Sequence, residues 1–186
     1  MKKLSIVTAL LLAFAAPTAS GNDKDRIRVK LIGYEEVPAV STAASGRFRA
    51  EISDDALSIA FKLTYTGLQG TVTQAHIHVG QRSVNGGIVL WLCGTATNLG
   101  PAGTQTCPAS VPGQEAEVSG TLDAGDVVAT PLPAAGGQQI SAGELAEVIA
   151  AIRAGVAYVN VHTSLSPGGE IRAQIGGGHG HHDHDD

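Results

Sequence analysis

Short runs in which apolar and polar residues alternate recur along the chain, a pattern typical of β-strands with one buried face. The alternating runs occupy residues 26–32, 46–52, 56–65, 74–80, 114–122, 158–163 and 170–175. A continuous apolar run at 88–92 predicts a further, fully buried strand. In the run at 56–65, the predicted core face consists of Leu57, Ile59, Phe61, Leu63 and Tyr65.

Residues 141–154 have the pattern of a single short helix. Ser141 and Glu144 have the spacing of a capping box, and Gly155 is suited to the end of a helix. Apolar residues recur at helical intervals at Leu145, Val148, Ile149 and Ile152. About eight short strands with one packed α-helix predict an all-β fold, an antiparallel Greek-key-like β-sandwich.

The first twenty residues have the pattern of a secretory signal peptide, in which Lys2 and Lys3 precede an apolar stretch and then small residues. We therefore expect a signal peptide at 1–20, one domain at 21–175, and a His- and Asp-rich tail without a core of its own at 176–186. The apolar stretch is too short and too early for a membrane span, and none is expected after removal of the signal. The predicted location is periplasmic or extracellular.

The formal net charge is −5, from 12 basic and 17 acidic residues. Loss of the two signal-peptide lysines makes the charge more negative. This balance argues against nucleic acid or an anionic membrane surface as the partner. Another envelope or extracellular protein stays open as a partner.

Cys93 and Cys107 are the only cysteines. In an exported protein we expect them to form a disulfide. The bond would close a segment rich in Gly, Thr and Asn, which contributes about 3 kcal/mol in the chain-entropy account. A redox role is not favoured, because a Cys-x-x-Cys spacing is missing.

Two histidines share one face of the strand at 74–80. The apolar residues there begin with Ala75 and recur at every second position, so His76 and His78 lie together on the polar face. Their Cα atoms are roughly 7 Å apart, which allows both rings to reach one metal at about 2 Å per nitrogen. His162 lies on the polar face of the strand at 158–163, which we expect to pair with or neighbour the first.

The three histidines predict a copper or zinc site on a sheet face. Asn160 or Glu170 is expected to accept a hydrogen bond from a ligating imidazole. A surface ion pair is expected between Glu170 and Arg172. The tail predicts a second, weaker metal site, formed by His179, His181, His182 and His184.

Five motifs resemble the chordin-type domain family, abbreviated CHRD. They are EVP at 36–38, GL at 67–68, AHIHVG at 75–80, YVNVHT at 158–163 and PGGEIR at 167–172. Ser166 stands where the family commonly has Asn, and Ala173 where Gly is usual. The resemblance implies an all-β extracellular module, found singly in bacterial secreted proteins. It implies no catalytic residues.

These observations favour an exported binding or scaffold protein that holds a metal ion, rather than an enzyme. One alternative is a metal-dependent redox enzyme related to copper–zinc superoxide dismutase, in which a similar His-x-His pair binds copper. However, no histidine lies between Val79 and Val161, so the bridging histidine and the zinc loop of that enzyme are missing. The other alternative is a purely structural envelope module whose histidines are not ligands.

Overall fold

The computed structural model describes residues 25–131 and 137–176, and their secondary structure is almost entirely β. The strands are β1 (Arg26–Ile32), β2 (Ser45–Ile52), β3 (Ile59–Thr66), β4 (Val72–Val79), β5 (Gly87–Cys93), β6 (Ala116–Leu122), β7 (Ala157–Thr163) and β8 (Ile171–Ile175). The described helices are α1 (Leu145–Arg153) and two short 3₁₀ turns, η2 (Gly33–Glu35) and η3 (Ala124–Asp126).

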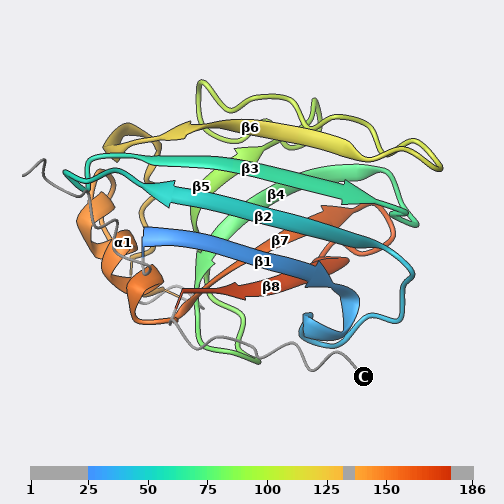
Figure 1. Ribbon diagram of the computed structural model, residues 1–186, viewed down its shortest axis with the longest axis horizontal. Helices are drawn as coiled ribbons and strands as arrows, with labels where there is room; N and C mark the ends of the chain where they lie inside the picture. The colour runs from blue at the N-terminus through green and yellow to red at the C-terminus, as the bar shows by residue number, and fades with distance from the viewer. Residues whose placement is uncertain (1–24, 132–136, 177–186) are drawn as a thin grey trace, which may run out of the picture.

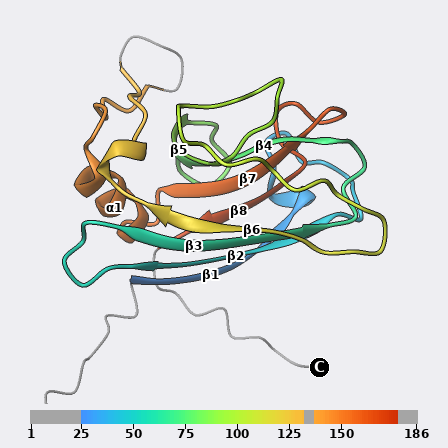
Figure 2. The same cartoon turned by 90° about the horizontal axis from the view of Figure 1, so that it is seen from above.

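The eight strands form one antiparallel sheet in the order β5-β4-β7-β8-β1-β2-β3-β6. Strands β8 and β1 are joined by a single residue pair, Ile32 with Arg172, and the sheet folds over at this junction. Two four-stranded layers therefore face each other, as Figures 1 and 2 show. A bridge between Leu90 and Val127 brings the two ends of the sheet together. The predicted all-β sandwich is confirmed, and it approaches a closed barrel.

The core lies between the two layers, because alternate residues of each strand point inward. Phe48 and Leu63 from one layer and Ile77 and Val161 from the other are all fully buried. Helix α1 covers one end of the sandwich (Figure 1), and its buried residues are the predicted ones, Leu145, Val148, Ile149 and Ile152.

Two sequence predictions about element boundaries are wrong. The helix begins at Leu145 rather than at residue 141, because Gly143 has φ +85°, outside the helical region. Part of the predicted cap does form, since the backbone N–H of Ser141 donates to the Glu144 carboxylate at 2.7 Å. Leu57 was expected in the core but is 68% exposed, because Ala56 at φ +56° turns the chain before β3 begins.

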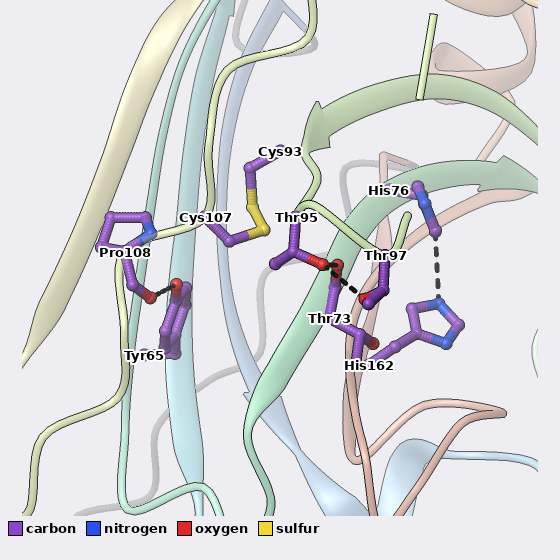
Figure 3. The surroundings of a disulfide bond; sticks show 9 residues. All are labelled: Tyr65, Thr73, His76, Cys93, Thr95, Thr97, Cys107, Pro108 and His162. Atoms are coloured by element: carbon purple, nitrogen blue, oxygen red, sulfur yellow. Dashed lines mark hydrogen bonds between the residues drawn. A yellow bond between two sulfur atoms is a disulfide. The ribbon is translucent and has the colours of Figure 1, made fainter. Parts of the chain in front are cut away.

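The predicted disulfide between Cys93 and Cys107 is present (Figure 3). It joins the end of β5 to the segment that leads into β6. Nearby, the Thr95 hydroxyl donates to the Thr73 carbonyl at 3.0 Å, and the Tyr65 hydroxyl donates to the Pro108 carbonyl. Among the described residues, no helix is long and apolar enough to cross a membrane. The predicted signal peptide at 1–20 lies outside the described residues.

Candidate metal centre

Strands β4 and β7 are hydrogen-bonded neighbours, and their register brings the three histidines together. His76 is paired with Asn160, His78 with Tyr158, and Gln74 with His162. All six residues therefore point to the same side of the sheet, away from the core. One ring nitrogen of each histidine lies within 4.8 Å of the corresponding nitrogens of the other two.

This face is buried, which the sequence did not indicate. His76 is 0% exposed, and His78 and His162 are each 6% exposed. The segments that connect the strands fold back over the layer and contact the rings through backbone carbonyls. The candidate site is therefore an enclosed one rather than a site on an open sheet face.

Two backbone carbonyls fix the orientation of two of the rings. Nδ1 of His78 lies 3.0 Å from the Gly86 carbonyl oxygen, and Nδ1 of His162 lies 2.9 Å from the Pro167 carbonyl oxygen. A carbonyl oxygen only accepts, so Nδ1 carries the proton in both rings. In a neutral imidazole, Nε2 of His78 and of His162 then holds a lone pair, the form in which histidine binds metals.

Nε2 of His162 has two close polar neighbours. Nδ1 of His76 lies 3.2 Å away, and Oδ1 of Asn160 lies 3.0 Å away. Figure 3 shows the contact between the two rings. If His162 is neutral and donates to Pro167, its Nε2 lone pair faces the Asn160 oxygen without a proton between them. A second proton on His162, or another cation beside it, makes this contact favourable.

Burial disfavours a second proton on any of the three imidazole rings. It lowers the pKa of His76 to about 2, aided by the neighbouring His162 and His78. It lowers the pKa of His78 to about 4, although the Gly86 carbonyl opposes the shift, and it lowers that of His162 as well. At neutral pH the three rings are therefore uncharged. Nε2 of His76 and Nε2 of His78 are buried without a hydrogen-bond partner in the described structure.

Aromatic and cationic groups hold the rings in place. The ring of Tyr158 is parallel to that of His78, with 3° between the planes and 4.6 Å between the centroids. The Arg172 guanidinium lies 3.4 Å from the centroid of the Tyr158 ring, a cation–π contact. Trp91 meets His76 edge to face at 4.2 Å. The imidazoles are thus fixed by packing as well as by hydrogen bonds.

Glu36 lies beside this cluster and is only 5% exposed. Burial raises the pKa of its carboxyl group to about 7, although the charge of Arg172 and a hydrogen bond from Asn160 oppose the shift. The Glu36 carboxyl group and the Asn160 side chain both lie very close to the backbone of Gly169. A Cβ atom on Gly169 would lie 2.2 Å from Oε1 of Glu36 and 2.8 Å from Nδ2 of Asn160. Glycine at 169 therefore leaves room for the contact between Glu36 and Asn160.

The two residues expected to support the ligands lie in different places. Asn160 is at the cluster, with its oxygen directed at His162. The carboxylate of Glu170 instead accepts hydrogen bonds from the Thr42 hydroxyl, the Gln69 backbone N–H and the Thr163 hydroxyl at 2.8–2.9 Å. These bonds attach two loops to β7 and involve no imidazole.

The expected surface ion pair between Glu170 and Arg172 is wrong. Both residues are buried, at 0% and 1% exposure. Arg172 donates to the Asn85 side chain at 3.2 Å and to the Val84 carbonyl at 2.9 Å. It therefore attaches the loop between β4 and β5 to the outer face of β4 and β7, which we call the histidine face because it carries His76, His78 and His162. It does not pair with an acid at the surface.

Sequence reasoning missed the roles of Glu36, Trp91 and Tyr158 and of the carbonyls at Gly86 and Pro167. The EVP, YVNVHT and PGGEIR motifs gave the only signal, since they contain Glu36, Tyr158 and Pro167 and resembled family markers without a stated chemical role for these residues. The tail histidines, at positions 179, 181, 182 and 184, lie outside the described residues.

Residues 27–175 match the CHRD domain, and the chain therefore belongs to the CHRD domain family. No curated protein and no solved structure matches the chain. The CHRD domain is of an extracellular type, and the disulfide agrees with an oxidising compartment. Family membership supports a role in binding or scaffolding.

Proposed function

We propose that this protein is an exported binding module that holds one copper or zinc ion through His76, His78 and His162. The contact around Nε2 of His162 carries the proposal. A neutral His76 can donate its Nδ1–H to this nitrogen, but the Asn160 oxygen then still faces the same lone pair without a proton. A bound cation supplies the missing positive charge.

The distances agree with ligation by two of the rings. Two nitrogens bound to a tetrahedral ion at about 2.0–2.1 Å are separated by roughly 3.3–3.4 Å. Nδ1 of His76 and Nε2 of His162 are 3.2 Å apart. The Gly86 and Pro167 carbonyls serve as the outer hydrogen-bond acceptors that ligating histidines usually have.

The donor atoms favour copper or zinc. Imidazole nitrogen suits both ions, whereas magnesium and calcium prefer several carboxylate or carbonyl oxygens. The three-histidine cluster includes no carboxylate. The Asn160 amide oxygen offers one further neutral ligand or a hydrogen bond to a bound water.

Burial favours retention of an ion over catalytic turnover. With the three rings 0–6% exposed, a substrate has little access to an ion between them. This is the observation that favours a binding module over a redox enzyme of the superoxide dismutase type. The tail histidines are proposed as a separate, weaker loading site.

The test uses protein truncated after Ile175, so that the tail histidines are removed, beside the same protein with His76→Ala and His162→Ala. Metal content after purification and titration with Zn²⁺ and Cu²⁺ are measured for both. We expect one tightly held equivalent in the truncated protein and none in the double variant. Equal, weak binding by both proteins refutes the site.

Two controls separate the alternatives. Circular dichroism of the metal-free double variant establishes that it is folded, so that lost binding is not lost structure. Superoxide turnover is measured with copper-loaded protein. Activity that His76→Ala abolishes would replace the binding module with the redox enzyme.

A further inference from the structure

The outer face of β1, β2 and β3 carries a concentration of positive charge. Six of the 12 lysines and arginines in the chain are exposed on this face. We call them the basic face: Arg26, Arg28, Lys30, Arg47, Arg49 and Lys62. They alternate with core residues along each strand, so all six point away from the core. This local charge contrasts with the net charge of −5.

The strand register places like charges directly opposite each other. Arg28 is paired with Arg49 and Arg49 with Lys62, which makes a row of three cations across three strands. Lys30 is paired with Arg47 in the next row. Neighbouring strands are about 4.8 Å apart, and like charges in directly opposed positions destabilise a sheet. Folding therefore gives no reason for this arrangement, whereas an anionic ligand does.

Acidic residues lie around the edge of the basic face rather than within it. Arg26 pairs with Glu51 at 3.4 Å, and Arg47 pairs with Glu115 at 3.3 Å. Lys62 pairs with Glu117 at 2.8 Å. All these side chains are highly exposed, and such pairs are weak and easily exchanged. Arg28, Lys30 and Arg49 form no ion pair within the described structure.

The composition of this face indicates what kind of ligand it fits. The large exposed apolar side chains of the described structure are Tyr34, Leu57, Val84, Leu99, Val111 and Leu165, and none belongs to β1, β2, β3 or β6. A protein partner normally needs apolar or aromatic anchors at the centre of its interface. Single-stranded nucleic acid normally stacks on aromatic residues. A ligand bound by charge and hydrogen bonds alone needs neither.

The shape of the charged area favours a linear ligand over a flat one. A planar anionic bilayer laid on this face would meet Glu51, Glu115 and Glu117 together with the cations. A single chain can follow the row from Arg28 to Lys62 and leave most of these acids aside. Arginine forks bind carboxylates with two parallel hydrogen bonds.

We propose that the basic face binds an acidic polysaccharide, a linear chain with carboxylates on successive sugars. The polymer lies across β1, β2 and β3. This site is independent of the metal centre, because the basic face and the histidine face lie on the outer sides of opposite layers (Figure 2). The protein thus presents an attachment surface on one layer and the histidine cluster on the other.

The test measures binding of the full mature chain to immobilised polygalacturonate, with neutral dextran as the reference polymer. The variant is Arg28→Gln/Arg49→Gln. The matched control is Arg82→Gln/Arg153→Gln, which removes the same charge from outside the basic face. We expect salt-sensitive binding to polygalacturonate only, weakened about tenfold or more in the first variant and less than about twofold in the control. The Tm of each variant is also measured, so that lost structure is not mistaken for lost binding. The first variant should be at least as stable as the wild type, because it has less like-charge repulsion.

Several results would overturn the proposal. The proposal fails if the protein does not bind polygalacturonate in low salt, if it binds dextran equally well, or if both variants lose affinity for polygalacturonate equally. Tighter, basic-face-dependent binding to vesicles that contain phosphatidylglycerol would assign the face to a lipid surface instead. Because the metal centre is not involved, His76→Ala/His162→Ala should bind the polymer as the wild type does.

Discussion

Nδ1 of His76 lies 3.2 Å from Nε2 of His162, although 86 positions separate the two residues in the chain. The pairing of β4 with β7 creates this contact, and the loops that cover both strands remove it from water. Two buried imidazoles at this distance either form an N–H···N hydrogen bond, with the proton on Nδ1 of His76, or bind a metal ion between them. The lowered pKa of each ring keeps all three rings uncharged, the form in which histidine binds metals, and under the proposed function several properties of the protein should depend on metal.

Metal removal should lower the stability of the protein. For an ion that binds only the folded state, free metal at 100 times its dissociation constant adds about 2.7 kcal/mol to the free energy of unfolding. We expect chelation to lower the Tm of protein truncated after Ile175, and Zn²⁺ to restore it. The Tm of His76→Ala/His162→Ala should be insensitive to both treatments, and Mg²⁺ should have no effect on either protein. If chelation leaves the Tm of the truncated protein unchanged, the proposed metal centre is contradicted.

Substitution of Gly169 should damage the site through Glu36 and Asn160. In Gly169→Ala the added Cβ would lie 2.2 Å from Oε1 of Glu36, and φ there is +124°, which alanine rarely adopts. We expect a loss of about 2–4 kcal/mol in the free energy of unfolding, together with weaker zinc binding. Gly168→Ala is the matched control, because a Cβ at that position meets no atom within 4 Å. Similar losses in the two variants, measured by urea unfolding, would exclude the contact as the cause.

The histidine cluster was predictable because it depends on strand periodicity. Alternation places His76 and His78 on one face of β4. The pairing of β4 with β7 then brings His162 to the same face. The same periodicity predicted the inward residues of most strands. It failed at Leu57, where a single residue with positive φ, Ala56, changes the direction of the chain before the strand starts.

Burial of the site was not predictable, because it depends on loops. Alternation separates two faces of a strand but does not show which face a distant loop will cover. The Gly86 and Pro167 carbonyls act through the backbone, so their residue types carry no sign of a hydrogen bond to histidine. Likewise, Arg172 and Glu170 looked like exposed charges because their partners, such as Asn85 and Thr42, are far away in sequence.

The disulfide should support both the fold and the metal centre. Closing this loop contributes about 3 kcal/mol in the chain-entropy account, so Cys93→Ser/Cys107→Ser should unfold at lower urea concentration. The loop also packs near the site, since a Cβ on Gly100 would lie 2.7 Å from the ring of Trp91, which contacts His76. We therefore expect a modest loss of zinc affinity as well. Unchanged urea midpoints would show that the loop is held by its other contacts, such as Thr95 with Thr73.

Acid should destabilise the metal-free protein, and the sign follows from the directions of the pKa shifts. The folded-state pKa values of the three histidines are lowered, to about 2 for His76 and about 4 for His78. The unfolded chain therefore binds protons below pH 6.5 that the folded protein does not bind. The histidine contribution to stability is complete above pH 6.5 and is lost as the pH falls towards the folded values.

Glu36 acts in the opposite direction. Its folded pKa is raised to about 7 from an ordinary 4.5, so the stability linked to it is present below pH 4.5 and is lost as the pH rises through 7. Between pH 4.5 and 6.5, one carboxyl group thus opposes three imidazoles. Each uncompensated proton is worth about 1.4 kcal/mol per pH unit, so the imidazoles should dominate.

Urea unfolding of chelator-treated protein at pH 7.5, 6.5 and 5.5 measures this balance. We expect the free energy of unfolding to fall between pH 6.5 and pH 5.5. In Glu36→Gln the opposing carboxyl group is gone, so the fall should be steeper. Saturating Zn²⁺ should move the acid transition to lower pH, because the ion competes with protons for the same nitrogens. Stability that is constant or rises on acidification, also in Glu36→Gln, would contradict the lowered pKa values of the imidazoles and with them the uncharged state that metal ligands need.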